Sequence, residues 1–424
     1  MRLRNYSFAP LVLFGVSSVC SADPAVDELH ALRTQVQELS EALASVRAQL
    51  ETQERVIQSF QKEVQSQQQD ATVTVRDVGG TVSSAPTYVP DIGVVADITG
   101  IVTESDEDEE GNDRLSVREL EIVFGHDIDP YSRLDVTVSI SDFEEAAIEE
   151  AYLTHSGLPF DIYGRLGRMH PRIGIAAAQH RDALFTVDEP LVIEQFFGAE
   201  GFSRTGLELS DIFSTISDDV VHEIIIGLLE GGAGEGGNLF GETRRAPTVY
   251  GRLRNAWDIS DSSVIDLGLN ALLGSADEDT SFETRAGGVD LRYQHYGAAF
   301  RKLTLQSELF VQDRDTAVLE DGELPEGLFE FRQKPLGLYA LANYRFGQQW
   351  EAGLRYDYVQ AVNRAEEQRD SFESEYSAFL TFHQSEFARW RLQYQLATLE
   401  TGEEDNRFFL QGTFAIGTHK HNLQ

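Results

Sequence analysis

The sequence predicts an all-β fold, a transmembrane antiparallel up-and-down β-barrel of about sixteen strands, preceded by an N-terminal α-helical coiled coil. Apolar and polar residues alternate in most segments from Asp91 to Gly417, as in Arg133–Ile140. A period of two places one set of side chains on each face of a strand. Short turns and long, often acidic connections follow one another in order along the same region. After the N-terminus no apolar run of about eighteen residues occurs, so a closed sheet is the structure expected to cross a bilayer.

Residues 1–22 have the composition of a secretory signal peptide. Two arginines precede an apolar stretch, and Cys20–Ala22 resembles a small-residue cleavage site. The alternative is a lipoprotein acylated at Cys20, but Val19 is bulkier than the residue expected before such a cysteine. Because Cys20 is the only cysteine, the mature chain is expected to contain no disulfide, cysteine-based metal site or cysteine nucleophile.

Residues 23–69 predict a periplasmic coiled coil. Apolar residues recur there at alternating steps of three and four, which is the spacing of the seam between partner helices. The alternative, an amphipathic helix lying on its own domain, would show a wider apolar stripe. Residues 70–90, with paired glycines, paired serines and two prolines, are expected to form a linker. The predicted oligomerisation seam consists of Leu29, Leu32, Val36, Leu39, Leu43, Val46, Leu50, Ile57, Phe60 and Val64.

Residues 91–424 are expected to form the barrel. If the coiled coil is periplasmic, the first strand runs outward, so inner turns should be short and outer connections long. A count two strands higher or lower stays open. The inner turns are expected at residues 127–130, 156–159, 211–218, 260–262, 297–300, 347–349 and 385–387. The outer connections are expected at residues 104–113, 141–145, 171–201, 230–247, 275–281, 313–335, 361–371 and 400–406.

Three late strands show the two faces of the sheet most clearly. In each strand, aromatic and aliphatic residues share the parity expected to face lipid, and polar residues share the parity expected to face water. A soluble β-sandwich also alternates, but it rarely places aromatics so regularly over so many strands. The lipid-facing set is Trp350, Ala352, Leu354, Tyr356, Tyr358, Tyr376, Ala378, Leu380, Phe382, Trp390, Leu392, Tyr394 and Leu396. The water-facing set is Glu351, Arg355, Asp357, Thr381, His383, Arg391, Gln393 and Gln395.

A barrel of this size has an interior too wide for its own wall side chains to fill, so a water-filled channel or a plug is expected. The segment before the barrel offers a rod and a linker, so we expect no globular plug. The connection over residues 171–201 is the best candidate to fold into the lumen, because it carries charges among apolar anchors. The alternative is an outward lid or a trimer-contact loop. The predicted pore-lining or constriction residues are Arg165, Arg168, Arg172, His180, Asp182, Asp188, Glu189 and Glu194.

Three segments carry a resemblance to a known family: Glu149–Tyr152, Gly164–Arg168 and His180–Phe197. They resemble a poorly characterised porin-like family often labelled zinc-regulated TonB-dependent outer-membrane receptor, and more distantly the phosphate-selective porins O and P. The resemblance covers most of residues 92–421. It implies zinc-linked regulation and energy coupling, although the sequence shows neither a plug nor a coupling box. The histidine-rich stretch of the family corresponds here to His170 and His180, and the implied zinc role falls by position on His180.

The chain carries 71 acidic and 34 basic residues, a net charge of −37, which argues against binding to nucleic acid. Phosphate selectivity rests on rings of basic residues, and here Arg165, Arg168 and Arg172 are expected to form one local basic patch. Acidic outer connections would give the pore a negative mouth and a weak cation preference. The alternative is that these charges serve solubility or bridge lipopolysaccharide through divalent ions. The acidic tracts are 104–113, 277–279 and 400–405.

Other chemical motifs are incomplete. The run Asp106–Gly111 resembles the opening of a calcium loop, but Val117 stands where a bidentate glutamate is needed. His419 and His421 supply two ligands of a metal site that would need more. A serine, histidine and aspartate on neighbouring strands form a trio of the kind that arises by chance in an acidic chain. We therefore expect no enzyme, no cofactor and no metal site.

The sequence thus predicts a passive pore in the outer membrane of a Gram-negative bacterium, with a periplasmic N-terminal coiled coil. Small hydrophilic solutes or ions would diffuse through a homotrimer tied together by the coiled coil, and a role related to metal ions stays open. The expected partners are the lipid bilayer, lipopolysaccharide and the barrel-assembly machinery. The alternative is a structural anchor that tethers the envelope through the coiled coil, and measurements of conductance distinguish the two functions.

Overall fold

The computed structural model describes nine stretches of the chain: residues 90–104, 113–142, 146–198, 202–214, 220–232, 245–275, 283–317, 330–362 and 371–417. They all belong to the second of two compact units, Tyr88–Gln424. The predicted signal peptide, the coiled coil with its seam from Leu29 to Val64, and nearly all of the linker lie outside the described residues. In the described part of the chain, no helix is long and apolar enough to span a bilayer.

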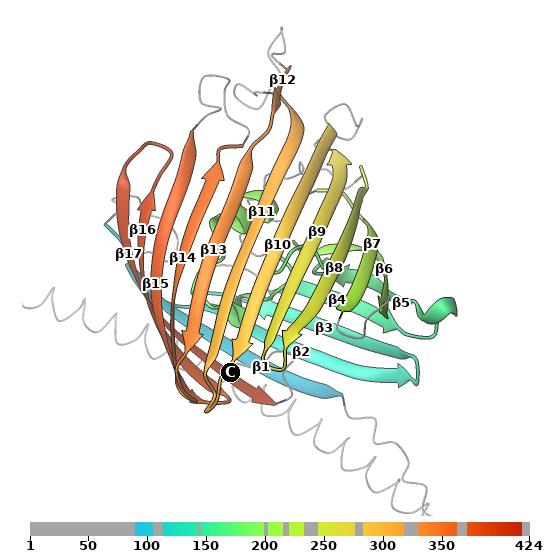
Figure 1. The fold of residues 1–424 in the computed structure, drawn as a ribbon, viewed down its shortest axis with the longest axis horizontal. Helices are drawn as coiled ribbons and strands as arrows, with labels where there is room; N and C mark the ends of the chain where they lie inside the picture. The colour runs from blue at the N-terminus through green and yellow to red at the C-terminus, as the bar shows by residue number, and fades with distance from the viewer. Residues whose placement is uncertain are drawn as a thin grey trace, which may run out of the picture. The chain divides into compact units, whose positions relative to one another are not determined.

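The described residues form a single antiparallel sheet (Figure 1). Its first half comprises β1 (Asp91–Val102), β2 (Leu115–Asp129), β3 (Ser132–Ile140), β4 (Ala147–His155), β5 (Tyr163–Met169), β6 (Arg204–Ser214), β7 (Val220–Leu229), β8 (Thr248–Ser260) and β9 (Ser263–Ser275). Its second half comprises β10 (Glu283–Tyr296), β11 (Lys302–Ala317), β12 (Glu330–Gln333), β13 (Leu336–Arg345), β14 (Trp350–Gln360), β15 (Phe372–Ser385), β16 (Ala388–Thr398) and β17 (Glu404–Gly417). The helical pieces are η1 (Pro159–Asp161), η2 (Arg181–Ala183) and α2 (Leu191–Phe197).

The sheet closes on itself, because β1 pairs with β17 from Gly93 opposite Gly417 to Val102 opposite Phe408. On its other side β1 pairs with β2. A closed sheet has no free edge, so every strand finds two partners for its backbone groups. The predicted antiparallel barrel is therefore confirmed.

β12 and β13 are one interrupted strand. Gln333 lies opposite Arg314 and Leu336 lies opposite Val311, so both pieces keep the same register on β11. Between them, the carbonyl of Pro335 accepts a hydrogen bond of 3.0 Å from the backbone N–H of Gln312. The interruption falls at a proline, which has no N–H to donate to a strand ladder. Counted as one strand, these pieces bring the barrel to the predicted sixteen strands.

Several strands run further into the connections than the sequence indicated. β2 continues to Asp129, β6 to Ser214 and β11 to Ala317, and β17 already begins at Glu404. In each case the extension is paired, as where Ala317 lies opposite Glu330 of β12. Polar residues at a strand end can meet water without leaving the ladder, so their polarity does not mark the boundary. The turns at 127–130 and 211–218 and the connections at 313–335 and 400–406 are correspondingly shorter than expected.

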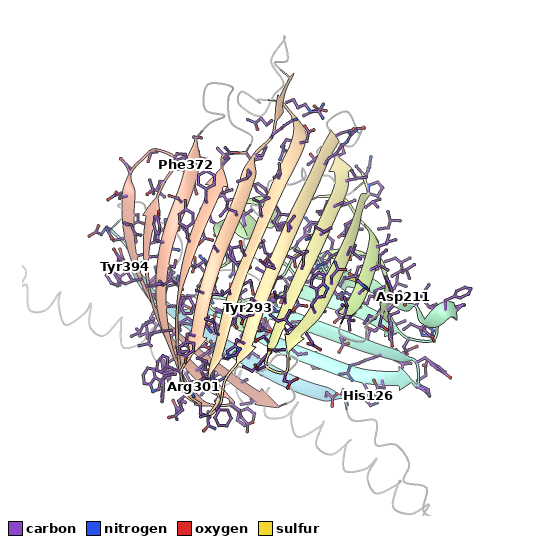
Figure 2. The ribbon with its side chains drawn as sticks, in the orientation of Figure 1. His126, Asp211, Tyr293, Arg301, Phe372 and Tyr394 are labelled. Carbon is purple, nitrogen blue, oxygen red and sulfur yellow. The ribbon has the colours of Figure 1, made fainter. Side chains whose placement is uncertain are left out.

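The outer face of the barrel carries the apolar side chains. Leu354 is 64% exposed, whereas its neighbour Arg355 is 2% exposed, because adjacent residues of β14 point to opposite faces. In Figure 2, Phe372 lies near one end of the strands and Arg301 near the other. The predicted lipid-facing parity is confirmed by the large exposed side chains Trp350, Leu354, Tyr376, Leu380, Trp390, Leu392 and Tyr394.

The inner face packs against the connection between β5 and β6. We call residues 170–203 the lumen loop, of which 170–198 and 202–203 are described. In Figure 1 the loop, drawn in green, lies behind β10–β14 and within the ring of strands. Its α2 contacts β13 and β14. A single buried apolar cluster joins the loop residues Ile173, Leu184, Val192, Ile193, Phe196 and Phe197 to the wall residues Ile225, Tyr250, Leu272, Phe310, Tyr339 and Phe379.

Candidate pore constriction

Apolar anchors fix the second half of the lumen loop to the wall. Phe197 of α2 is fully buried, and its ring meets that of Phe310 edge-on at 5.2 Å. α2 lies so close to β13 that a Cβ added to Gly337 would approach Val192 to 2.3 Å. Glycine at this wall position therefore permits the helix to pack directly on the strand backbone.

A carboxylate of the wall holds the first half of the loop. Glu308 of β11 accepts the backbone N–H groups of Ile175 at 2.8 Å and Ala176 at 2.7 Å, and the hydroxyl of Tyr339 at 2.6 Å. Next to it, the backbone N–H of Gly174 donates to Asn270 at 3.0 Å. The loop thus lies against β9 and β11, four and six strands along the sheet from β5. The backbone N–H groups of residues 174–176 are all bound there.

Gly174 makes this contact possible. Its φ is +61°, and an added Cβ would lie 2.1 Å from Oε2 of Glu308. We expect Gly174→Ala to displace the loop from Glu308 and to lower the free energy of unfolding by about 1–3 kcal/mol. Urea unfolding in lipid vesicles measures this loss. Gly347→Ala is the matched control, because an added Cβ meets nothing within 4 Å there, and equal stability of the two variants would contradict the contact.

Arginines of the wall bind the middle of the loop. Arg391 is 1% exposed and donates to the carbonyls of Thr186 at 2.6 Å and Leu184 at 2.8 Å. Arg355 bridges Asp357 of its own strand, at 2.6 Å, and Asp188 of the loop, at 2.5 Å. The loop is thereby attached to β14 and β16 by charge-assisted hydrogen bonds, which are stronger than neutral ones.

Two neighbouring acids of the loop have opposite pKa shifts. Burial alone would raise the pKa of Asp188, but the charge of Arg355 and the hydrogen bonds from Gln393 and Arg355 together outweigh burial and hold this pKa below its ordinary value. Burial raises the pKa of Glu189 to about 8, because Arg181, 3.6 Å away, compensates only in part. At neutral pH the loop is therefore held by an ionised Asp188 and carries a protonated Glu189.

The shift of Glu189 predicts a pH dependence. An exposed glutamate loses its proton at about pH 4.3, whereas Glu189 in the docked loop keeps it up to about pH 8. The contribution of Glu189 to stability is therefore fully present below about pH 4.3 and is lost as pH rises to about 8. We expect Glu189→Gln to raise the thermal unfolding midpoint at about pH 9 and to change it little at about pH 4. Glu403→Gln, at an exposed glutamate, is the control, and an equal effect at both pH values would contradict the assignment.

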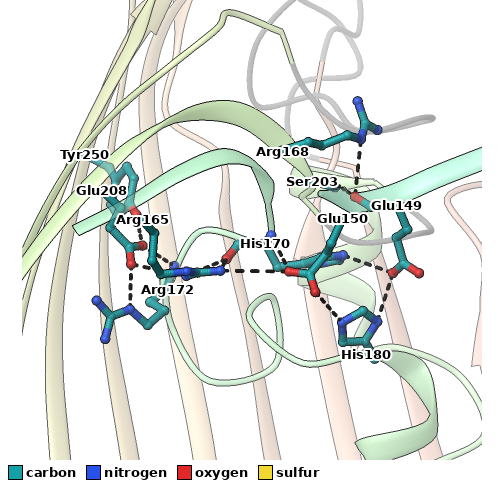
Figure 3. Close-up of polar contacts among 10 residues, drawn as sticks. All are labelled: Glu149, Glu150, Arg165, Arg168, His170, Arg172, His180, Ser203, Glu208 and Tyr250. Carbon is teal, nitrogen blue, oxygen red and sulfur yellow. Dashed lines mark hydrogen bonds and ion pairs between the residues drawn. The ribbon is translucent and has the colours of Figure 1, made fainter. Parts of the chain in front are cut away.

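Two of the three predicted arginines meet on one carboxylate. Nη1 of Arg165 lies 3.1 Å and Nε of Arg172 lies 2.7 Å from Oε1 of Glu208, which also accepts the hydroxyl of Tyr250 (Figure 3). Arg168 lies apart and donates to the backbone carbonyl of Glu149 at 3.2 Å. An odd spacing along β5 separates Arg165 from Arg168, and such residues point to opposite faces of a strand. The expected patch of three arginines therefore consists of two.

A further group of contacts surrounds His180. A β-bulge in β4 leaves Glu149 without a cross-strand partner on β3, because Thr137 pairs with Glu150 and Val138 pairs with Ile148. Nδ1 of His180 lies 3.0 Å from Glu149, and Nε2 lies 3.2 Å from Glu150 (Figure 3). Burial lowers the pKa of His180, but the carboxylates of Glu149 and Glu121 outweigh burial and raise it well above its ordinary value.

Three of the eight predicted constriction residues are buried rather than available to a solute. His180, Asp182 and Glu189 are at most 7% exposed, and the carbonyl of Asp182 accepts Arg389 at 2.7 Å. The side chain of Arg172 is 32% exposed, and Glu194 of α2 is exposed. These two residues are therefore the members of the predicted set best placed to contact solute.

A polar cavity of about 430 Å³ lies beside the loop, between it and β4–β6. The uncharged side chains that line this cavity were not predicted from the sequence. The same is true of Glu208 and Glu308, which bind residues of the loop. The inward parity of β4, β6 and β11 was the available signal for these side chains. The cavity is lined by Tyr152, Thr154, Tyr163, Arg165, Arg172 and Ser210, among others.

Comparisons with known proteins place this geometry in context. No protein-family model matches the chain. An uncharacterized protein from Aquifex aeolicus (strain VF5) is 25% identical over 317 residues, which cover 69% of this chain and 66% of that protein, just under two thirds of its length. An anion-selective porin from Comamonas acidovorans aligns with a TM-score of 0.51 at 13% identity, over 77% of this chain and 99% of that one. Salmonella typhi OmpF in complex with daunomycin aligns with a TM-score of 0.52 at 12% identity, over 77% and 97%.

At these identities the likeness to the solved structures shows the fold. The barrel of this chain has the fold of outer-membrane porins. The anion selectivity of the Comamonas porin and the daunomycin bound by OmpF are properties of those proteins. The TonB-dependent and phosphate-selective labels implied by the sequence resemblance find no support in these comparisons.

Proposed function

We propose that the chain is an outer-membrane channel through which small hydrophilic solutes or ions diffuse passively, and that the lumen loop narrows it. The observation that carries the proposal is the closed sixteen-strand barrel with apolar side chains outside and a charged wall inside, crossed by a loop that this wall holds. Barrels of this size enclose an aqueous channel unless it is filled. The polar cavity beside the loop is the space that solutes would enter.

We further propose a weak preference for cations. The net charge of −37 supports a negative potential at the mouth, since charged walls raise the local concentration of counter-ions. The acid on α2, Glu194, is exposed, whereas Arg165 and Arg172 are largely offset by Glu208 and Glu223. The pore-lining role of the predicted constriction residues is part of this proposal, with Arg172 and Glu194 as the members that meet solute.

The reversal potential of the purified protein in a planar bilayer under a salt gradient tests this function. Discrete ohmic steps with a reversal potential of cationic sign are the expected result. Replacing the acidic residues of 104–113 by their amides is expected to move the reversal potential toward zero, because the mouth loses charge. A reversal potential of anionic sign would overturn the selectivity, and silence from correctly folded protein would overturn the channel.

A homotrimer assembled through the predicted coiled coil is the oligomeric state that we propose. The regular a and d spacing from Leu29 to Val64 supports self-association. Chemical cross-linking in detergent is expected to yield trimers from the full chain. Replacing Leu39 and Leu43 together by aspartate should reduce the yield of trimers, and an unchanged yield would contradict assembly through the seam.

A further inference from the structure

A cluster of histidines and carboxylates joins the lumen loop to the wall. His170 and His180 belong to the loop, Glu149 to the bulge of β4, and Glu119 and Glu121 to β2. Nε2 of His170 and Nδ1 of His180 each lie 3.0 Å from Oε1 of Glu149. Nδ1 of His180 also lies 3.3 Å from Oε1 of Glu121. Three potential ligand atoms, from the loop and from β4, therefore converge on one small volume, and Glu121 of β2 contacts one of them.

The distances match those within a metal coordination shell. Ligands of a tetrahedral zinc ion lie at about 2.0–2.1 Å from the metal and thus about 3.4 Å from one another. The donor atoms here are 3.0–3.3 Å apart where they are paired. Two sets, Glu149 with His170 and His180, and Glu149 with Glu119 and Glu121, each offer ligand atoms within 4.8 Å of one another. Imidazole and carboxylate ligands together favour a divalent transition metal such as zinc over calcium or magnesium.

Two further observations point to a ligand. Oε2 of Glu149 is buried and accepts no hydrogen bond from the described residues, and it borders a small cavity that Glu119, His170 and His180 also line. A buried carboxylate oxygen without a donor is costly. On the other side of the ring, Nε2 of His180 pairs with Glu150 at 3.2 Å. Carboxylates that bind the outer nitrogen of a metal-ligating histidine fix the tautomer that leaves the inner nitrogen for the metal.

We propose that Glu149, His170 and His180 form a binding site for a divalent transition-metal ion that fastens the lumen loop to the wall. Glu150 is the positioning residue that orients His180. The bulge in β4 gives the site its geometry, because it leaves Glu149 unpaired beside Glu150. The ion would link the start of the loop to β4, whereas Glu308, Arg355 and Arg391 bind the loop from other strands of the wall.

Metal binding is tested on the full chain, folded in detergent and stripped with a chelator. Cobalt(II) is the probe, because a tetrahedral site with nitrogen and oxygen ligands gives it strong visible absorption, and zinc should displace it with loss of colour. We expect one tightly bound cobalt(II) per chain. Binding should weaken by about 100-fold in Glu149→Gln and His180→Ala, and by about 10-fold to 100-fold in Glu150→Gln.

His383→Asn is the matched control. His383 is buried on the inner wall and pairs with Glu351 at 3.2 Å, but it belongs to neither set of candidate ligands found among the described residues. This variant should bind cobalt(II) as the unaltered protein does. Binding that is lost equally in His383→Asn, or that survives in both Glu149→Gln and His180→Ala of demonstrated folding, would overturn the site, as would the absence of stoichiometric uptake.

The consequence for transport rests on the proposed channel function and is measured separately. Saturating zinc should reduce the frequency of loop-opening events in single-channel records of the unaltered protein and leave His180→Ala unaffected. Cobalt(II) binding in a protein that does not conduct would overturn the channel and keep the site. Conductance in a protein that takes up no cobalt(II) would overturn the metal site and keep the channel.

Discussion

Arg355→Ala is expected to cause one of the largest losses of stability of any single substitution in the barrel. Arg355 is fully buried and binds Asp357, which is also fully buried, and Asp188 of the lumen loop. Removing one partner of a buried ion pair costs about 3–5 kcal/mol, because the remaining charge stays desolvated without compensation. The loop should also detach from β14, since Arg355 donates to the side chain and the carbonyl of Asp188.

Urea unfolding in lipid vesicles, followed by tryptophan fluorescence, measures this loss. Arg285→Ala is the matched control, because Arg285 and Glu283 form an exposed pair at 2.8 Å, each 60% exposed. Exposed pairs contribute about 0–1 kcal/mol. The double variant Arg355→Ala/Asp357→Asn should recover part of the stability, because the orphaned charge is removed. Equal losses in Arg355→Ala and Arg285→Ala would show that the pair does not hold the loop.

The same ion pair predicts that acid releases the loop. The pKa of Asp188 is lowered in the docked loop, so its contribution to docking is present above its ordinary pKa and is lost as pH falls through the lowered value. Single-channel conductance of the unaltered protein should therefore rise in acid as the loop detaches. In Asp188→Asn the conductance should already be high at neutral pH, and a channel that stays narrow in this variant would contradict the role of Asp188.

Deleting residues 180–194 is expected to change conductance more than any point substitution. The deletion removes the part of the loop that Arg355, Arg389 and Arg391 hold, together with most of α2. The single-channel conductance should rise by about twofold or more, because conductance follows the width of the aqueous path. The wall arginines would then face water, which replaces the lost hydrogen bonds.

The control for this deletion is a shortening of the outer connection over residues 318–329, which has a similar length. Heat-dependent mobility in gels shows whether each variant has formed its barrel. Unchanged conductance in a correctly folded deletion variant would mean that the lumen loop does not limit the current.

The barrel could be predicted because its signal is local. The two-residue turn Asp261–Ser262 and the opposite exposure of Leu354 and Arg355 follow from turn chemistry and a period of two. Strand ends were less predictable, since they depend on the partner. The charged end of β11 remains in the sheet because β12 pairs with it up to Ala317.

The lumen loop was predictable in part. Apolar residues such as Leu184 and Phe196 in a long charged connection indicated that it packs against something, and both are buried in the structure. The identity of the wall partners was not predictable. Glu308 binds Ile175 and Ala176 only because the closed sheet brings β11 against the loop. The pattern of residues within one strand does not show how the sheet closes.

The histidine cluster shows the limit of sequence reasoning most clearly. His170 and His180 were singled out, but regular alternation would send Glu149 and Glu150 to opposite faces of β4. The bulge opposite Thr137 and Val138 changes this arrangement, and a bulge is a property of the pairing rather than of either strand alone. For the same reason, the approach of Glu149 to the two histidines could not be predicted from the sequence.

The most direct test of a channel narrowed by an internal loop is thiol modification during single-channel recording. Glu194 is exposed on α2, whereas the apolar side chains of this helix pack against the barrel. Cys20 is the only cysteine in the sequence. In a Cys20→Ser background, a bulky water-soluble thiol reagent should lower the conductance of Glu194→Cys and leave that of Glu403→Cys unchanged, and a reductant should restore it. Full labelling of Glu194→Cys, verified by mass, without any change in current would contradict the account.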